Sequence, residues 1–155
     1  MVYVKKTGTL VVPVIKKKER KKMLELKVRI REVSVEKKDE SNDIIYLNYV
    51  PNPQRGYKGV AKMLWRLLHK NHGHHLWINT DVYVRKHNRW IYFMSFDDKL
   101  FPQPGSLFCK RNFSTRKRVQ GFLRLLRKCQ ERALKTEEVP ERLGITDDIH
   151  VSFER

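Results

Sequence analysis

Four histidines in the middle of the chain are the side chains best suited to metal chemistry. His69 and His72 lie three residues apart, and His74 and His75 follow directly after Gly73. Two or three of these imidazoles could converge on one ion. However, adjacent residues of a strand point to opposite faces, and no cysteine pair has zinc-finger spacing. We therefore expect a basic contact, or a helix end whose cations meet the last carbonyls, and neither a metal nor a cofactor.

Aspartates near this region support a hydrolytic alternative. A metal-dependent nuclease needs acids that hold a divalent ion close to a group that activates water. The candidates are His69, His72, His74, His87, Asp81, Asp97 and Asp98. Adjacent aspartates after a strand more often form turns, and the chain has no Gly-rich phosphate loop or G-x-S-x-G elbow. We assign no catalytic residue, and the sequence favours a binding protein over an enzyme.

Positive charge is the strongest global feature of the chain. Its 155 residues include 34 Lys plus Arg against 17 Asp plus Glu, for a formal net charge of +17 and a pI of about 10.1. Self-repulsion of this size destabilises a small domain, so it is usually retained for a polyanionic partner. The first expectation is nucleic acid, either RNA or DNA. An acidic protein or an anionic membrane surface is the alternative partner.

The first basic cluster is the run KKKERKK at 16–22, followed by a strand whose charged side chains face outward. Such a run matches the loose pattern of a nuclear localisation signal and also neutralises phosphates. A solvated connection between strands is the other interpretation. The candidate contacts here are Lys16, Lys17, Lys18, Arg20, Lys21, Lys22, Lys27 and Arg29.

The second basic cluster accompanies a predicted helix in the last third of the chain. Its candidate contacts are Arg111, Arg116, Lys117, Arg118, Arg124, Arg127, Lys128, Arg132 and Lys135. Between Lys110 and Lys135 the only acid is Glu131, whereas an ordinary solvated face mixes both signs. Arginines beside a helix N-terminus add to its attraction for anions. We expect this helix to be the main phosphate surface.

Aromatic residues alternate with charge between these clusters. Trp77 shares strand parity with Tyr83, and Trp90 shares it with Tyr92. These rings could stack unpaired bases if one face of the sheet is open. Burial in the sheet core is the favoured alternative, because most aromatics of this kind are buried. By parity, Trp90 and Tyr92 belong with Met94 and Phe96.

The elements that position these residues follow from periodicity. Alternation over 24–30 predicts a half-buried strand, and the change of parity after Arg31 predicts a β-bulge near Arg31 and Glu32. Residues 44–50 predict a well-buried strand, and 9–15 an edge strand. Residues 74–84 and 89–96 predict a hairpin with 85–88 as its turn, and the DDKLFPQPG segment that follows predicts a loop. A last strand is expected at 148–153.

Two segments have helical periodicity, at 58–71 and 115–136, with Ser114 or Thr115 as the cap of the second. Cys129 falls on the expected core stripe of that helix.

The order of these elements lacks a regular βαβ alternation. It predicts one compact α+β domain over 1–155, with a largely antiparallel sheet, two packed helices and 16–22 as a basic connector. Cys109 and Cys129 are too few for a disulfide framework and fit a reducing compartment.

The remaining expectations concern location and biological class. The sequence lacks an apolar run of membrane-spanning length and an N-terminal secretory signal, so we expect a cytosolic or nuclear protein. Compact basic composition is typical of small viral or mobile-element accessory proteins that act in movement, packaging or silencing suppression. Binding should be mainly electrostatic and weakly sequence-specific.

Overall fold

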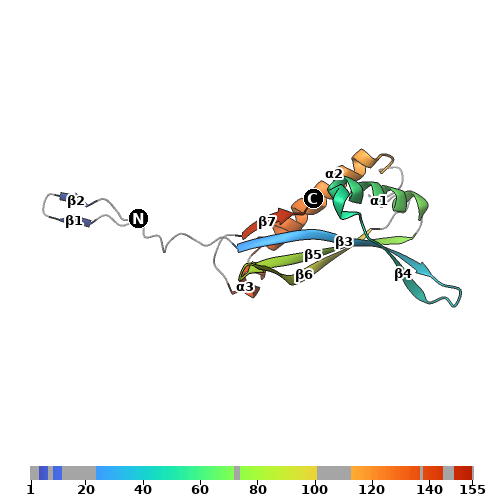
Figure 1. Ribbon diagram of the computed structural model, residues 1–155, viewed down its shortest axis with the longest axis horizontal. Helices are drawn as coiled ribbons and strands as arrows, with labels where there is room; N and C mark the ends of the chain where they lie inside the picture. Colours follow the sequence, from blue (N-terminus) through green and yellow to red (C-terminus); the bar gives the residue numbers. More distant parts are fainter. Residues whose placement is uncertain are drawn as a thin grey trace.

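A five-stranded sheet forms the body of the protein, with helices on one of its faces (Figure 1). The computed structural model describes residues 4–6, 9–11, 24–71, 74–100, 113–136, 138–144 and 149–154. The sheet contains β3 (Leu24–Lys38), β4 (Ile44–Tyr49), β5 (His75–Lys86), β6 (Arg89–Leu100) and β7 (Ile149–Phe153). The helices are η2 (Pro53–Arg55), α1 (Gly56–Lys70), α2 (Arg116–Leu134) and α3 (Glu138–Arg142). The predicted α+β class, compact domain and two packed helices are confirmed, and α3 is an additional short helix.

Strand β3 is the centre of the sheet. One of its edges pairs with β5, and the other edge is shared by two strands: β7 pairs along Leu24 to Val28, and β4 along Val33 to Lys38. The β7 pairing is parallel and all the others in this sheet are antiparallel. Residues 29–32 therefore have no strand neighbour on that edge within the described chain.

The predicted bulge in β3 is confirmed. Its register against β5 shifts between Ile30 and Glu32. The extra residue keeps Leu26 and Val28 on the same buried face as Val33 and Val35, although the two pairs differ in sequence parity.

A second bulge, between β5 and β6, overturns part of the aromatic prediction. The register shifts between Val82, which pairs with Met94, and Tyr83, which pairs with Tyr92. Trp90 and Tyr92 therefore leave the face of Met94 and Phe96, both of which pack against the core, and join Tyr83 on the opposite face. The favoured prediction that these rings are buried is wrong, because Tyr92 is 56% exposed and Trp90 is 37% exposed.

The hairpin of β5 and β6 has longer strands and a shorter turn than predicted. Its turn is His87 and Asn88 alone, with positive φ angles of 52° and 60°, the backbone that matches strand twist in a two-residue turn. Asn is among the residues that adopt positive φ angles at low cost in free energy. At its other end β6 continues to Leu100, so Asp97 and Asp98 lie inside a strand and do not form the predicted turn.

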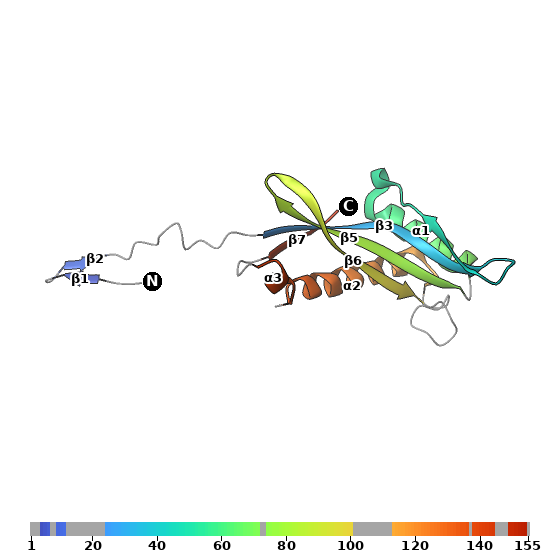
Figure 2. The same cartoon turned by 90° about the horizontal axis from the view of Figure 1, so that it is seen from below.

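Helices α1 and α2 cover one face of the sheet, and none of the described helices covers the other (Figures 1 and 2). Leu64 and Leu68 of α1 are fully buried in the same core cluster as Ile78 of β5. On α2 the buried positions are Val119, Leu123, Gln130 and Leu134. The predicted core position of Cys129 is wrong because this thiol is exposed. Its neighbour Gln130 is inward and donates to Thr80 Oγ1 at 3.3 Å and to Asp98 Oδ2 at 3.1 Å.

Strand β4 is an edge strand, and the prediction that it is well buried is also wrong. Ile44 is 59% exposed and Tyr46 is 52% exposed, and Ile45 and Leu47 also face solvent. The β3–β4 hairpin extends past the helices at one end of the sheet, so the layer that buries the other strands does not reach it (Figure 1).

Near the N-terminus, β1 (Val4–Lys6) pairs with β2 (Thr9–Val11), and this pair forms its own two-stranded sheet. The predicted edge strand at 9–15 coincides with β2 in its first three residues, and its remainder lies outside the described residues. The basic run 16–22, Arg111, His72 and Cys109 also lie outside them. None of the described helices is long and apolar enough to cross a membrane.

Candidate nucleic-acid interface

Helix α1 presents a row of cations that the sequence analysis did not assign. Lys58, Lys62, Arg66 and Lys70 follow at intervals of four residues, so they lie on one side of the helix. The segment 56–70 contains no Asp or Glu. None of the ion pairs between described residues involves any of these four cations. Their spacing was visible in the sequence, but only the apolar stripe of this segment was considered there.

Three of the α1 cations, Lys62, Arg66 and Lys70, open onto a shallow groove between the helix and the end of β4. Met63, Leu67 and Tyr49 contribute its apolar surface. Its basic lining residues are Arg55, Lys62, Arg66 and Lys70. Phosphates in such a groove would contact the cations while sugars lie on the apolar surface.

Two glycines allow the turn η2 to bring Arg55 to this groove. Gly56 ends the turn with a φ of 57°. A Cβ at Gly59 would lie only 2.8 Å from the Arg55 Cβ, so a larger residue there would displace the turn. Asn52 caps the turn by accepting from the Gln54 N–H at 3.0 Å.

Helix α2 adds its N-terminal arginine to the same cluster. Thr115 accepts from the Arg118 N–H at 3.3 Å, so the predicted cap is confirmed. Arg116 then lies over the ring of Trp65, with its guanidinium carbon 5.3 Å from the ring centroid. Trp65 donates from Nε1 to the Ser114 carbonyl at 3.2 Å, which connects α1 to the start of α2.

The electrostatics at Lys62 show that these charges lie close together. Nearby Arg66, Arg116 and Arg55 lower the pKa of Lys62, in that order of importance, because a like charge disfavours its protonated form. An anion bound among these four residues would remove this repulsion. We refer to Arg55, Lys58, Lys62, Arg66, Lys70 and Arg116 as the α1 cation cluster.

The other predicted contacts of α2 divide by orientation. Arg124, Lys128 and Arg132 are exposed, as are Lys117 and Arg118 next to the cap. Arg127 instead turns inward, where its guanidinium carbon lies 3.9 Å from the Tyr57 ring centroid. Lys135 follows the helix and pairs with Glu131 at 2.9 Å. The exposed cations of α2 extend the basic helical layer that the α1 cation cluster begins.

Lys27 and Arg29 do not belong to this layer. They lie on the open face of the sheet, where Lys27 Nζ is 4.7 Å from the Trp90 ring centroid and Arg29 pairs with Glu154 at 3.4 Å. The predicted contacts therefore occupy two faces of the protein.

The open face of the sheet carries a network of paired polar groups. Arg31 donates to Asp81 Oδ1 at 2.9 Å, and Ser95 donates to the same oxygen at 2.9 Å. Glu36 accepts from Tyr46 at 3.1 Å and contacts His75 Nδ1 at 2.5 Å. The hydrogen bond to His75 is the main reason why the pKa of Glu36 is below its usual value. The carboxylates of Asp81 and Glu36 therefore already have cationic or hydrogen-bonding partners.

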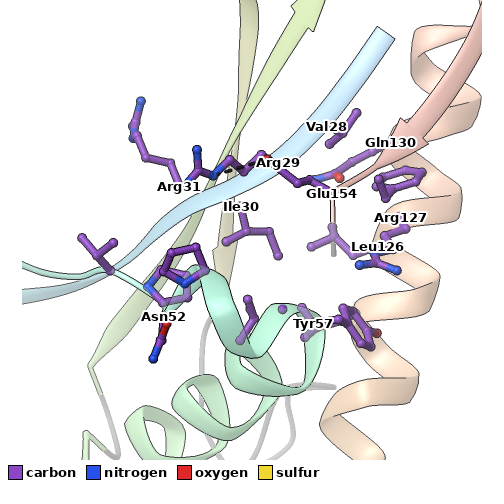
Figure 3. Close-up of a pocket in the computed structure, with 17 residues that line it drawn as sticks. Val28, Arg29, Ile30, Arg31, Asn52, Tyr57, Leu126, Arg127, Gln130 and Glu154 are labelled. Atoms are coloured by element: carbon purple, nitrogen blue, oxygen red, sulfur yellow. Dashed lines mark ion pairs between the residues drawn. The ribbon is translucent and has the colours of Figure 1, made fainter. Parts of the chain in front are cut away.

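A pocket occupies the gap in the sheet between β7 and β4 (Figure 3). Tyr57 and Arg127 face each other on its helical side, and Arg29 and Glu154 are joined across its other side. Its volume is about 90 Å³. Small-molecule sites are usually several times larger, so this pocket is too small for a nucleotide.

Within the described residues, the histidines and aspartates of the nuclease alternative are not brought together, and His72 lies outside these residues. His69 donates from Nδ1 to the Trp65 carbonyl at 2.8 Å, and Asp81 is held by Arg31. Asp97 and Asp98 are adjacent in β6 and so point to opposite faces. Within the described part of the chain, no three His, Cys, Asp or Glu residues are grouped to hold a metal ion.

Comparison with protein-family models, with curated proteins and with solved structures finds no match for this chain. The site must therefore be interpreted from its own residues.

Proposed function

We propose that this protein binds nucleic acid and that its basic helical layer holds the phosphates. The observation that supports this most is the α1 cation cluster, because four of its cations line one groove and Arg116 lies close enough to Lys62 to lower the pKa of that side chain. None of its six cations has a carboxylate partner among the described residues. A charge cluster maintained against its own repulsion is suited to a polyanion. Contacts of this kind position a backbone and carry little sequence information.

The exposed cations of α2 would widen the same phosphate surface, and the run 16–22 would add a second one. This arrangement suits a small accessory protein of a virus or mobile element that acts in movement, packaging or silencing suppression in the cytosol or nucleus, with 16–22 as a nuclear address. An acidic protein could engage the same layer by charge alone. A repeating row of cations at four-residue intervals favours a regular polyanion over an irregular acidic surface.

The salt dependence of binding tests the proposal. Each lost phosphate contact reduces the steepness of the fall of log K with log salt by about one. The variant Lys62→Gln/Arg66→Gln should therefore lose about two from the slope and about 30-fold in affinity at physiological salt. Lys37→Gln/Lys38→Gln removes the same charge from the β3–β4 hairpin and should bind almost as the wild type does.

A second variant measures the contribution of α2 to binding separately from that of α1. The variant is Arg124→Gln/Lys128→Gln/Arg132→Gln. If α2 also contacts phosphates, this variant should have a less steep salt dependence than the wild type, while its circular dichroism spectrum stays unchanged. Equal affinities for wild type and both helical variants would reject the helical layer as the binding surface. If the wild type binds an acidic protein but no RNA or DNA, and the helical variants lose that affinity, the acidic protein is favoured as the partner.

A further inference from the structure

Three aromatic rings gather on the open face of the sheet, away from the helical layer. Tyr83 of β5 and Tyr92 of β6 meet edge to face, with ring centroids 6.2 Å apart. Trp90 lies two residues before Tyr92 on the same face, opposite Arg85 in the register. The bulge after Val82 is what brings these rings together, so the cluster is a product of the fold and not of simple alternation.

One of these rings is held by hydrogen bonds. The Tyr92 hydroxyl and Ser95 Oγ are 2.7 Å apart, Ser95 donates to Asp81, and Asp81 accepts from Arg31. This chain fixes the Tyr92 ring while its surface remains exposed. A fixed, exposed ring can stack a flat ligand at a low entropic cost.

Cations surround the rings. Lys27 Nζ is 4.7 Å from the Trp90 centroid and 5.4 Å from that of Tyr83, and the Arg85 guanidinium carbon is 5.7 Å from Trp90. Arg85 also pairs with Glu25 at 3.6 Å. Among the described residues no carboxylate lies within ion-pair distance of Lys27, or of Lys86 and Arg89 beside the turn.

We infer that Trp90, Tyr92 and Lys27 form a binding site for the unpaired bases of single-stranded nucleic acid. Bases would stack on the exposed rings, and Lys27, Lys86 and Arg89 would contact the backbone. A double helix hides its base faces and would not use this site. The inference rests on the proposed function, since it concerns a second surface for the same class of ligand.

The test compares two faces and two ligands. The variant Trp90→Ala/Tyr92→Ala should lose about tenfold or more in affinity for a single strand of about 12 nucleotides, because stacking contributes substantially for each base. Its affinity for a duplex should not change. Trp90→Phe retains flat rings at both positions and keeps the Tyr92 hydroxyl bonded to Ser95, so it serves as the matched control. U-only RNA and T-only DNA strands reveal any preference for a sugar.

The outcomes are distinguishable. If the wild type binds neither single strands nor duplexes, the proposed function fails. If it binds single strands and the double alanine variant binds them equally well, the stacking site alone is rejected. Equal loss on single strands and duplexes would also reject it, because that result indicates a general electrostatic or folding effect.

The exposed edge strand β4 supports a second, independent inference. Its sequence IIYLNY has no charged residue, whereas natural edge strands usually carry charges or proline that prevent pairing. In the chain, Glu40 and Asp43 precede β4, and the first charged residue after it is Arg55 at the end of η2. In an antiparallel pair of two β4 strands, the acidic end of each would meet the basic end of the other.

We propose that β4 pairs with β4 of a second copy of this chain. A twofold axis perpendicular to the sheet would keep both α1 helices on one side and place the two α1 grooves on one continuous surface. Sedimentation should show a dimer that dissociates on dilution, and Ile44→Lys/Tyr46→Lys should remain monomeric while folded. A wild type that is monomeric at every concentration, or a lysine variant that dimerises equally, would overturn this proposal.

Discussion

The two faces of this protein use charge in opposite ways. On the open face, Arg31 pairs with Asp81, Arg85 with Glu25 and Arg29 with Glu154. On the helical face, the α1 cation cluster has no carboxylate partner among the described residues. Exposed ion pairs contribute little to stability, so the pairs on the open face mainly arrange neighbouring side chains. The cations of the helical face remain available to a ligand.

This difference shows why net charge alone did not locate the site. Arg29 and Arg85 belong to the same positive excess as Lys62 and Arg66, but each of them pairs with a carboxylate on its own face. Whether a cation is available depends on its neighbours in three dimensions. The following predictions test this comparison.

The largest effect should come from the core that both faces share. Leu64 is fully buried between α1 and the sheet, so Leu64→Ala should lower the free energy of unfolding by about 3 kcal/mol. Urea denaturation measures the change. Protein that remains folded should bind both ligands normally, and a loss below about 1 kcal/mol would mean that the core can collapse around the cavity.

Removal of a charge should destabilise the open face more than the helical face. Asp81 is buried and accepts from Arg31 and Ser95, so Asp81→Ala should cost about 2 kcal/mol. Arg66→Gln should change stability by less than about 0.5 kcal/mol, because no ion pair is lost. Equal costs in thermal or urea unfolding would contradict the distinction between paired and available charges.

A smaller effect is expected at the start of α2. Thr115→Ala removes the acceptor for the Arg118 N–H and should cost about 1 kcal/mol. Thr115→Ser retains a hydroxyl and should retain most of the stability. If alanine and serine have the same midpoint in urea, the cap does not hold this end of the helix.

The smallest effect depends on pH and has opposite signs on the two faces. Burial raises the pKa of Asp98 beneath α2, so the folded state holds this proton more tightly than the unfolded state does. The stability from Asp98 is therefore present at low pH and declines as pH rises from 3.8 through its folded pKa. Asp98→Asn should raise Tm at neutral pH, and the gain should vanish in acid.

Glu36, whose pKa is lowered by its hydrogen bond with His75, should instead lose its contribution to stability as pH falls below 4.5.

Scanning calorimetry at several pH values measures the Asp98 effect, and Glu36→Gln provides the comparison. A gain for Asp98→Asn that persists unchanged in acid would mean that the buried carboxylate charge is not its cause.

The elements of the fold were largely predictable from local patterns. Alternation located β3, its parity change located the bulge at Arg31, and apolar spacing located α1 and α2 within about two residues of their ends. The exposure of β4 was not predictable, because an apolar run does not show whether a helix covers it. Gln130 could not be recognised as buried either, since its partners Thr80 and Asp98 are distant in sequence.

The candidate site was predictable in part. The charge of α2 was evident, and the four-residue spacing of Lys58, Lys62, Arg66 and Lys70 was present but not considered. The convergence of Arg55 and Arg116 on α1 depends on the tertiary packing of η2 and α2, which no local pattern contains. The ring cluster was hidden by the second bulge, which reverses the parity of Trp90 and Tyr92.

Nuclear magnetic resonance titration of the labelled protein with a short duplex tests the central claim most directly. The account predicts that amide shifts concentrate at Lys62, Arg66 and Arg116 and their neighbours on α1 and α2, and that they disappear at high salt. Shifts confined to the open face or to β4, with the α1 cation cluster unchanged, would contradict it.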